Sequence, residues 1–416
     1  MQNRISEISK ILIPHPNSNS IKKIELFRKF DESSLPKGNF SLKWEPERKK
    51  SREKPYYFPL WLADMDYPVA DCIQSALQNV VSSSNFGYTN TSEAYYQSII
   101  NWHWNNYKVL FKKEEIYRYS QKTLVGIGLI IQAFSEKNDA VIVLSPVYNM
   151  FYENILMNER KLVESHMIYK DRTFLIDFVD FEEKIILNKP KIFIFCNPHN
   201  PIGRVFKKEE IYKLHEICLR FNVIFVSDDV FSEIVFEENK YIQPFMSPFE
   251  NNTVLVTSIG KNFNINGLDT GYCVIKNKKL REKFSKAAQK ISLDESFGNI
   301  FSHIATIAAY SNEGKFWLDC VREYIYENYK MMVKYFEENL NEIVPVKLEG
   351  SFVLLCDYSK LGISESVFLK KCEEENIIFS KGSSYHVPTN MFRINIACSK
   401  KFLKEVLEKL KEIFKK

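Results

Sequence analysis

The sequence predicts an α/β fold in which helices cover both faces of a mostly parallel central sheet, joined to a smaller α+β domain. Two observations support this prediction. Several short apolar runs are continuous rather than alternating, which is typical of strands buried on both faces of a sheet. Segments with helical spacing separate these runs, as the crossovers between parallel strands require. The runs lie at residues 140–144, 192–195, 223–226, 254–256 and 272–275.

Length and composition indicate an ordinary globular protein. The 416 residues are enough for a large core and two domains, and 45% hydrophobic with 26% charged residues is a typical balance. The 57 basic and 52 acidic residues leave a net charge of only +5, so we expect no nucleic-acid partner. No apolar run reaches the ~18 residues of a membrane-spanning helix, and we expect no membrane association.

Cysteine and histidine spacing predicts neither a disulfide framework nor a metal site. The eight cysteines are scattered without a Cys-x-x-Cys pair, and the seven histidines show no metal-ligand spacing. Residues 1–20 lack the apolar core of a secretory signal. Together these features predict a cytoplasmic protein.

The N-terminal part of the chain is predicted to lie outside the large domain. Residues 1–25 are expected to be a variable leader, with a helix broken at residues 14–20, which are rich in Pro, Asn and Ser. The charge-rich stretch that follows has few apolar anchors, namely Phe40, Leu42 and Trp44.

A second set of elements predicts the smaller domain. A helix at residues 316–340 is followed by apolar runs and a final helix, at residues 352–355, 377–379, 393–396 and from 401. We therefore divide the chain into a leader (1–25), a large domain (80–315) and a small domain formed by residues 26–79 and 316–416.

Helical spacing predicts further helices at residues 71–84, 93–111, 123–134 and 207–221. The third of these contains Gly126 and Gly128 in its first turns. A helix start with free N–H groups can cradle a phosphate. Close packing of the backbone at the two glycines is an equally good interpretation of this stretch alone.

Lys261 is the candidate nucleophile. The apolar run 253–256 leads into the peptide TSIGK (257–261), which places one lysine among small groups at a strand end. Partial exclusion of water disfavours the ammonium, lowers the pKa of the lysine and allows it to form a Schiff base with an aldehyde. By itself the pattern is more often that of a solvated surface lysine. Whether Lys261 is a nucleophile therefore depends on the motifs in the rest of the chain.

Polar loops follow the other apolar runs, and ligands of open α/β sheets bind beyond such strand ends. These loops are SPVY (145–148), NPHNP (197–201) and SDD (227–229). Asp64 and Asp66 form another candidate pair of carboxylates. Polar residues shortly before a proline, here Pro68, also commonly cap a turn, and this second interpretation stays open.

Taken in chain order, these stretches resemble the fold-type I pyridoxal 5'-phosphate (PLP) enzymes, the aspartate aminotransferase superfamily. Within it, the chain is most similar to the MalY/PatB group of cystathionine β-lyases, also called C–S lyases. The resemblance extends from about residue 40 to the C-terminus and implies an aspartate-aminotransferase-like fold. The matching stretches are WLADMD (61–66), GYT (87–89), SPVY (145–148), CNPHNPIGR (196–204), VSD (226–228), SIGKNFN (258–264) and RINIAC (393–398).

The resemblance implies PLP as the cofactor and assigns its binding residues. Lys261 would hold it as a Schiff base and later move the Cα proton as general base. Asp228 would pair with the protonated pyridine nitrogen, which keeps the ring an electron sink. The other implied contacts are Asn200 at the phenolic oxygen, Tyr148 on the ring face, and Ser258 with the backbone N–H groups of Thr123 and Leu124 at the phosphate.

Substrate contacts and an assembly are implied in the same way. Arg393 resembles the arginine that takes the substrate α-carboxylate through its planar fork. Asp64 would lie at the substrate. Tyr88 resembles a catalytic tyrosine that reaches the phosphate bound by the neighbouring subunit, so a homodimer with shared active sites is implied.

Three residues depart from the family pattern. Lys122 replaces the glycine usual before the phosphate loop, which predicts a differently shaped cradle. Phe231 stands where relatives carry His or Tyr, and a phenyl ring cannot hydrogen-bond the phenolic oxygen. Asp269 stands where many relatives carry a basic phosphate ligand, and a carboxylate there would repel the phosphate. Phe231 and Asp269 together suggest a specialised or weakened catalyst.

Three functions therefore stay open, in descending order of support. The first is a PLP-dependent β-lyase that eliminates a thiol from cystathionine or another cysteine-type amino acid, giving pyruvate and ammonia. The second is an aminotransferase, which would use the same Lys261, Asp228 and Arg393. The third is a regulatory or binding protein that keeps the fold with little catalysis.

Overall fold

The computed structural model describes residues 16–32, 40–44, 54, 56–119, 121–236, 239–246, 250–293 and 298–415. Most of the predicted leader, residues 1–15, lies outside this part of the chain. Within the described ranges, no helix combines the length and the apolar character needed to cross a lipid bilayer.

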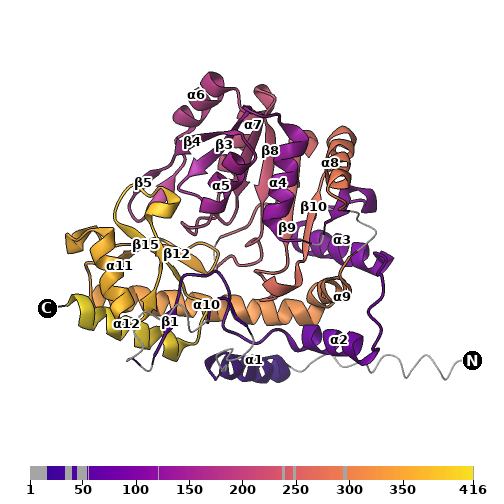
Figure 1. Cartoon of the computed structure of the whole chain (residues 1–416). Helices are drawn as coiled ribbons and strands as arrows, with labels where there is room; N and C mark the ends of the chain where they lie inside the picture. Colours follow the sequence, from indigo (N-terminus) through magenta and orange to yellow (C-terminus); the bar gives the residue numbers. More distant parts are fainter. Residues whose placement is uncertain are drawn as a thin grey trace, which may run out of the picture.

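The predicted sheet is present and has seven strands (Figure 1). Their order is β2 (Ile116–Arg118), β10 (Gly271–Val274), β9 (Thr253–Ser258), β8 (Ile224–Asp228), β7 (Ile192–Cys196), β3 (Ala140–Ser145) and β4 (Lys161–His166). The strands from β9 to β4 run parallel, whereas β10 runs antiparallel to both of its neighbours. This confirms the α/β class with a mostly parallel central sheet.

Alternate residues of the strands face two different layers of helices, which explains why the strands are apolar throughout. On one face, Phe193 packs with both Phe181 and Phe225. On the other face, Ile194 and Val226 belong to a second buried cluster. The first layer contains α6 (Phe178–Asn188) and α7 (Lys208–Arg220); the second contains α4 (Thr123–Phe134), α5 (Asn149–Met157) and α8 (Lys278–Lys290).

A second, four-stranded antiparallel sheet forms from the C-terminal part of the chain. Its order is β11 (Val344–Pro345), β12 (Val353–Asp357), β15 (Met391–Asn395) and β14 (Ser380–Lys381). The helices near it are α10 (Asn312–Asn339), α11 (Glu365–Glu374) and α12 (Lys400–Phe414). Figure 1 shows α10 running beneath both sheets. The exact domain boundaries stay a prediction.

The remaining elements connect or cover these two sheets. Helices α2 (Asp71–Ser82) and α3 (Glu93–Tyr107) pack against α9 (Ile300–Ala309), and α1 (Pro16–Asp31) packs against α10. Two short ladders pair β1 (Phe58–Pro59) with β13 (Ile377–Ile378) and β5 (Ile168–Lys170) with β6 (Thr173–Leu175). Single 3-10 turns are η3 (Lys113–Glu115), η4 (Pro244–Met246), η5 (Glu250–Asn252), η6 (Asn266–Leu268), η7 (Ser359–Leu361) and η8 (Ser383–Tyr385).

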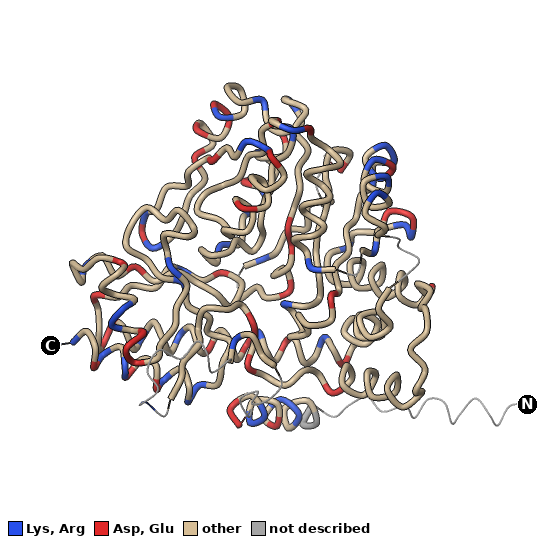
Figure 2. The backbone as a smooth tube through the Cα atoms, viewed as in Figure 1, with Lys and Arg blue, Asp and Glu red and all other residues tan. Residues whose placement is uncertain are grey.

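The positive charge of the chain is concentrated on α8 (Figure 2). This helix, KKLREKFSKAAQK, carries six basic residues and one acidic residue. The difference equals the net charge of +5 of the whole chain. The rest of the sequence is therefore balanced, and the electrostatics of any buried site must come from individual side chains.

Three local predictions near the N-terminus were wrong. Helix α1 begins at Pro16, inside the predicted break, because proline is tolerated in the first helical turn. The expected apolar anchors Phe40 and Leu42 are exposed, by 98% and 52%, whereas the next residue, Lys43, is buried. Helix α3 ends at Tyr107 rather than near residue 111, since Lys108 takes the left-handed conformation with φ 58°.

The packing of the central sheet predicts the cost of a cavity. Phe193 is fully buried, and its ring lies 4.8 Å from that of Phe181 and 5.2 Å from that of Phe225. Phe193→Ala should lower the free energy of unfolding by about 3–5 kcal/mol, measured by urea denaturation. Leu187→Ala on α6, where the side chain is 79% exposed, is the control and should change it by less than ~0.5 kcal/mol. Equal effects of the two substitutions would contradict this packing.

Candidate active site

The candidate site lies where the parallel strands end. Asp228 is the last residue of β8 and Ser258 the last residue of β9, with Lys261 three residues further on. Asn200 and Tyr148 lie in the loops that follow β7 and β3. Because β3, β7, β8 and β9 are parallel neighbours, these loops share one edge of the sheet.

Lys261 combines a partly buried side chain with several nearby charges. Its Nζ donates a hydrogen bond to the carbonyl oxygen of Ala63. Loss of hydration lowers the pKa of Lys261 to about 8; the negative charge of Asp64 opposes this shift, and the positive charges of Arg393 and Lys122 add to it. Near neutral pH a far larger fraction of this amine is therefore neutral and nucleophilic than of an exposed lysine.

Asp228 is a buried carboxylate that has no salt-bridge partner in the described part of the chain. One hydrogen bond reaches it, from the backbone N–H of Val230 at 3.1 Å. Burial raises the pKa of Asp228 to about 7, while that hydrogen bond and the charge of Lys261 act in the opposite direction. The site thus holds a carboxylate that a cationic ligand group would keep ionised.

Arg393, on β15, reaches the same site from the four-stranded sheet. Its Nη1 donates to Asn200 Oδ1 at 3.1 Å, and its Nη2 donates to the carbonyl of Trp61 at 2.6 Å and to Ser380 Oγ at 3.1 Å. The guanidinium lies 5.1 Å from the centre of the Tyr385 ring. Its Nε is buried, and none of the described residues offers it a hydrogen-bond acceptor. The guanidinium of Arg393 is therefore fixed in orientation, and its Nε–H can still donate a hydrogen bond.

The start of α4 forms a second part of the site. The helix begins at Thr123, and no side chain of the described residues caps this end. The N–H groups of Thr123 and Leu124 are thus available to an anion at a helix N-terminus. Ser258 Oγ lies 2.8 Å from Thr270 Oγ1 and accepts a hydrogen bond from the N–H of Gly260.

The charges of the site act on Tyr148 and involve Asp64, whereas Tyr88 lies at the surface of the single chain. The charge of Arg393 acts on Tyr148, whose pKa is raised to about 12, chiefly by burial. Asp64 Oδ1 accepts a hydrogen bond of 2.8 Å from Asn266 Nδ2, and its charge acts on Lys261. Tyr88 is 97% exposed, so its predicted role would need a partner subunit.

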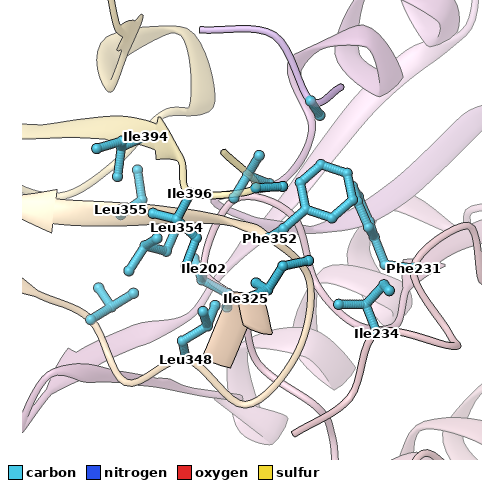
Figure 3. Packing of buried hydrophobic residues seen from close by; sticks show 14 of the residues in the cluster. Ile202, Phe231, Ile234, Ile325, Leu348, Phe352, Leu354, Leu355, Ile394 and Ile396 are labelled. Atoms are coloured by element: carbon cyan, nitrogen blue, oxygen red, sulfur yellow. The ribbon is translucent and has the colours of Figure 1, made fainter. Parts of the chain in front are cut away.

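The structure explains how the three departures are accommodated. Lys122 has φ −65° and ψ 150°, an ordinary extended conformation that needs no glycine, and its charge reaches Lys261. Phe231 is buried with its ring 5.2 Å from that of Phe352, among isoleucine and leucine side chains (Figure 3). Asp269 takes the left-handed conformation, φ 50°, at the end of η6. The neighbouring Thr270, rather than Asp269, contacts Ser258.

The sequence did not point to several residues that hold the site together. Thr270 lies beside Ser258, and Asn264 hydrogen-bonds the backbone at Met65. Lys43 forms a buried ion pair with Asp66. The only sign of this ion pair in the sequence was the pair of carboxylates, Asp64 and Asp66, around Met65. Their basic partner could not be identified, since Lys43 lies among many lysines in a charge-rich stretch.

The chain is similar to proteins of a known family. Residues 60–410 match the family of class I and II aminotransferases. The chain belongs to this family. Among its relatives is the cystathionine β-lyase PatB of Bacillus subtilis (strain 168), 30% identical over 387 residues that cover 92% of this chain and 98% of PatB. Protein MalY of Escherichia coli (strain K12) is 25% identical over 354 residues, 83% of this chain and 89% of MalY. The chain is a member of the MalY/PatB group.

Solved structures of the aminotransferase family agree with this assignment. A PLP-bound protein of Clostridium difficile 630, which carries an aminotransferase name, is 34% identical with a TM-score of 0.86, covering 92% of this chain and 99% of that one. Cystalysin of Treponema denticola, which contains PLP, is 26% identical with a TM-score of 0.88, covering 93% and 98%. The fold is that of the fold-type I enzymes, and PLP is the cofactor.

The residues present fit this cofactor. An amine of lowered pKa, Lys261, suits an aldehyde. A buried carboxylate without a salt bridge in the described residues, Asp228, suits a protonated pyridine. An uncapped helix start at Thr123, with Ser258 supplying a hydroxyl, suits a phosphate. The individual roles of these residues stay predictions.

The charges around Lys261 predict how its reactivity depends on pH. Only the neutral amine reacts with an acylating reagent, so labelling of Lys261 in the cofactor-free protein should have its midpoint at about pH 8. Asp64→Asn removes a charge that stabilises the ammonium and should move the midpoint down by about 0.5–1 pH unit. Arg393→Met should move it up. Mass spectrometry of the labelled peptide gives the midpoints.

The matched control is Asp71→Asn, because Asp71 pairs with Lys29 at the surface and should leave the midpoint unchanged. Shifts of the same sign in the Asp64 and Arg393 variants would contradict the arrangement of charges.

Proposed function

We propose that the chain is a PLP-dependent C–S β-lyase that eliminates a thiol from cystathionine or a related cysteine-type amino acid, giving pyruvate and ammonia. One observation carries the proposal: an amine of lowered pKa, Lys261, and the guanidinium fork of Arg393 converge on one site. These are a base and a carboxylate anchor, which α,β-elimination from an amino acid requires. The resemblance to PatB over nearly its whole length supports this choice of substrate.

Each side chain has a defined task in this proposal. Bound PLP supplies the electron sink for charge that develops at Cα. Arg393 binds the α-carboxylate, and because Trp61 and Ser380 fix its Nη2, the substrate is held in one orientation. Lys261 Nζ accepts the Cα proton. Asp228 holds a proton on the pyridine nitrogen, since a buried carboxylate favours a cationic partner.

A homodimer with shared active sites is part of the proposal. The aromatic side chain of Tyr88 is almost fully exposed in the single chain, and Phe86 beside it is 57% exposed. Large exposed aromatic residues are a common feature of association surfaces. Tyr88 would then contact the phosphate bound by the partner subunit.

An aminotransferase is the second candidate. The C. difficile protein with an aminotransferase name is 34% identical to this chain. Lys261, Asp228 and Arg393 would serve both reactions, which differ in whether the β-substituent leaves or the proton returns to the cofactor. The apolar environment of Phe231 leaves a third candidate, a protein with little catalysis, because no hydrogen bond to the phenolic oxygen can come from this side chain.

We also propose that the protein is cytoplasmic. All eight cysteines are free thiols, and most are buried. Proteins of reducing compartments keep their cysteines in this form.

The reaction itself tests the proposed function. Purified protein supplied with PLP should turn yellow and release pyruvate from cystathionine. Lys261→Ala should slow this release by about 10²–10⁴-fold, because the general base is lost. Lys276→Ala, which removes a lysine paired with Glu250, is the control and should behave as wild type. A yellow protein that instead bleaches with the amino acid and recovers with a keto acid would be an aminotransferase; no turnover of either kind would leave the third candidate.

Mixing two inactive variants tests the shared site. Lys261→Ala and Tyr88→Ala would place both defects in one site of a mixed dimer and leave the other site intact. Random reassociation should therefore recover about a quarter of the wild-type activity. Lys261→Ala mixed with Asp228→Ala is the control, because each site of that mixed dimer keeps one defect. Recovery in both mixtures, or in neither, would contradict a site built from two subunits.

A further inference from the structure

Residues 61–67 form a strap between the two residues on which the proposed chemistry depends. At one end, the carbonyl of Trp61 accepts a hydrogen bond of 2.6 Å from Arg393 Nη2. Two residues later, the carbonyl of Ala63 accepts a hydrogen bond from Lys261 Nζ. The strap therefore sets the distance between the base and the carboxylate anchor.

Further hydrogen bonds hold the strap on both sides. The N–H of Met65 donates to Asn264 Oδ1 at 3.2 Å, in the loop that carries Lys261. The N–H of Asp66 donates to the carbonyl of Ala397 at 2.9 Å, just beyond β15. Asn395 Nδ2 donates to the carbonyls of residues 62 and 64, both at 2.7 Å. The backbone of the strap thus joins the large sheet to the small one.

An ion pair between Lys43, in the N-terminal region, and Asp66 of the strap holds the strap in place. Lys43 Nζ donates to Asp66 Oδ2 at 2.8 Å and to the carbonyl of Asp64 at 3.0 Å. Trp44 Nε1 donates to the other oxygen, Asp66 Oδ1, at 3.0 Å. The side chains of Lys43 and Asp66 are only 1% and 3% exposed. Every polar group of the pair therefore has a partner in the protein.

The chemistry of the pair argues for a positional task. Burying two charges costs hydration free energy that their attraction offsets only with good geometry, so such a pair is weak evidence for stability alone. A single ammonium here bonds both the carboxylate and the backbone of the strap. Its second acceptor, the carbonyl of Asp64, belongs to the peptide group next to the carbonyl that takes Lys261.

We propose that Lys43 is a positioning residue of the active site: through Asp66 and the Asp64 carbonyl it fixes the strap, and the strap places Lys261 and Arg393. This inference rests on the proposed function for the roles of those two residues. In this proposal Lys43 acts through its contacts with Asp64 and Asp66 and not on the substrate directly.

The test compares three variants with wild type. Lys43→Met removes the donor and leaves Asp66 as an unpaired buried charge. Lys43→Met with Asp66→Asn removes both charges and keeps an oxygen for Trp44, so its folding stability should recover. Lys29→Met is the matched control, because Lys29 pairs with Asp71 at the surface of the same region.

Two readouts separate a positional task from a structural one. Hydrogen exchange of the amides at residues 65 and 66, measured by mass spectrometry without cofactor, should become at least about tenfold faster in both Lys43 variants. The KM for cystathionine should rise about tenfold or more in both, with a smaller change in kcat, because Arg393 loses its orientation. Lys29→Met should match wild type in both readouts.

Two results would overturn the inference. The first is exchange and KM at wild-type values in a folded Lys43 variant. The second is a double variant in which exchange and KM recover together with stability, which would make the pair purely structural. If Lys43→Met alone does not fold, the double variant still decides. A wild-type protein that acts on no amino acid would remove the proposed function, and the exchange measurement would then decide the task of Lys43 by itself.

Discussion

Parallel pairing of β3, β7, β8 and β9 is the constraint on which the site depends. Parallel strands present all their carboxyl ends at one edge, so groups far apart in the sequence meet without any long loop. Asp228 and Lys261 follow neighbouring strands for this reason. The pattern requires apolar residues on both faces of each strand, and two layers of helices pack against those faces.

Burial acts on the two central groups in opposite directions. It lowers the pKa of Lys261 to about 8 and raises that of Asp228 to about 7. Each shift reflects the cost of holding a charge away from water, so each group is in part uncharged near neutral pH. The same burial favours ligand binding by each group, because a partner of opposite charge or a covalent bond offsets the lost hydration. The electrostatics of the site therefore suit PLP, the cofactor of the family.

Much of this could be predicted from local patterns. The strands β8 and β9 follow from continuous apolar runs that change abruptly to polar residues after 226 and 256, two residues before the strands end. The contact of Arg393 with Asn200 could not, because it depends on how the two sheets pack. The task of Lys43 was missed for a related reason: its apolar neighbours Phe40 and Leu42 are exposed, while the charged residue is buried. Periodicity predicts faces of elements, but a single buried charge is defined by a partner elsewhere in the chain.

The connections made by the strap have a consequence for biosynthesis. Trp61 and Arg393 are separated by 332 positions, and Ala63 and Lys261 by 198. A ribosome translates the chain from its N-terminus. The strap therefore cannot form its contact with Arg393 until most of the protein has been synthesised. The strands of the seven-stranded sheet end at Val274 and the helices α4 to α8 that cover it end at Lys290, so this part can pack earlier. The nascent chain can thus acquire a folded core while it is still incapable of chemistry, and activity begins only after the final strand is released.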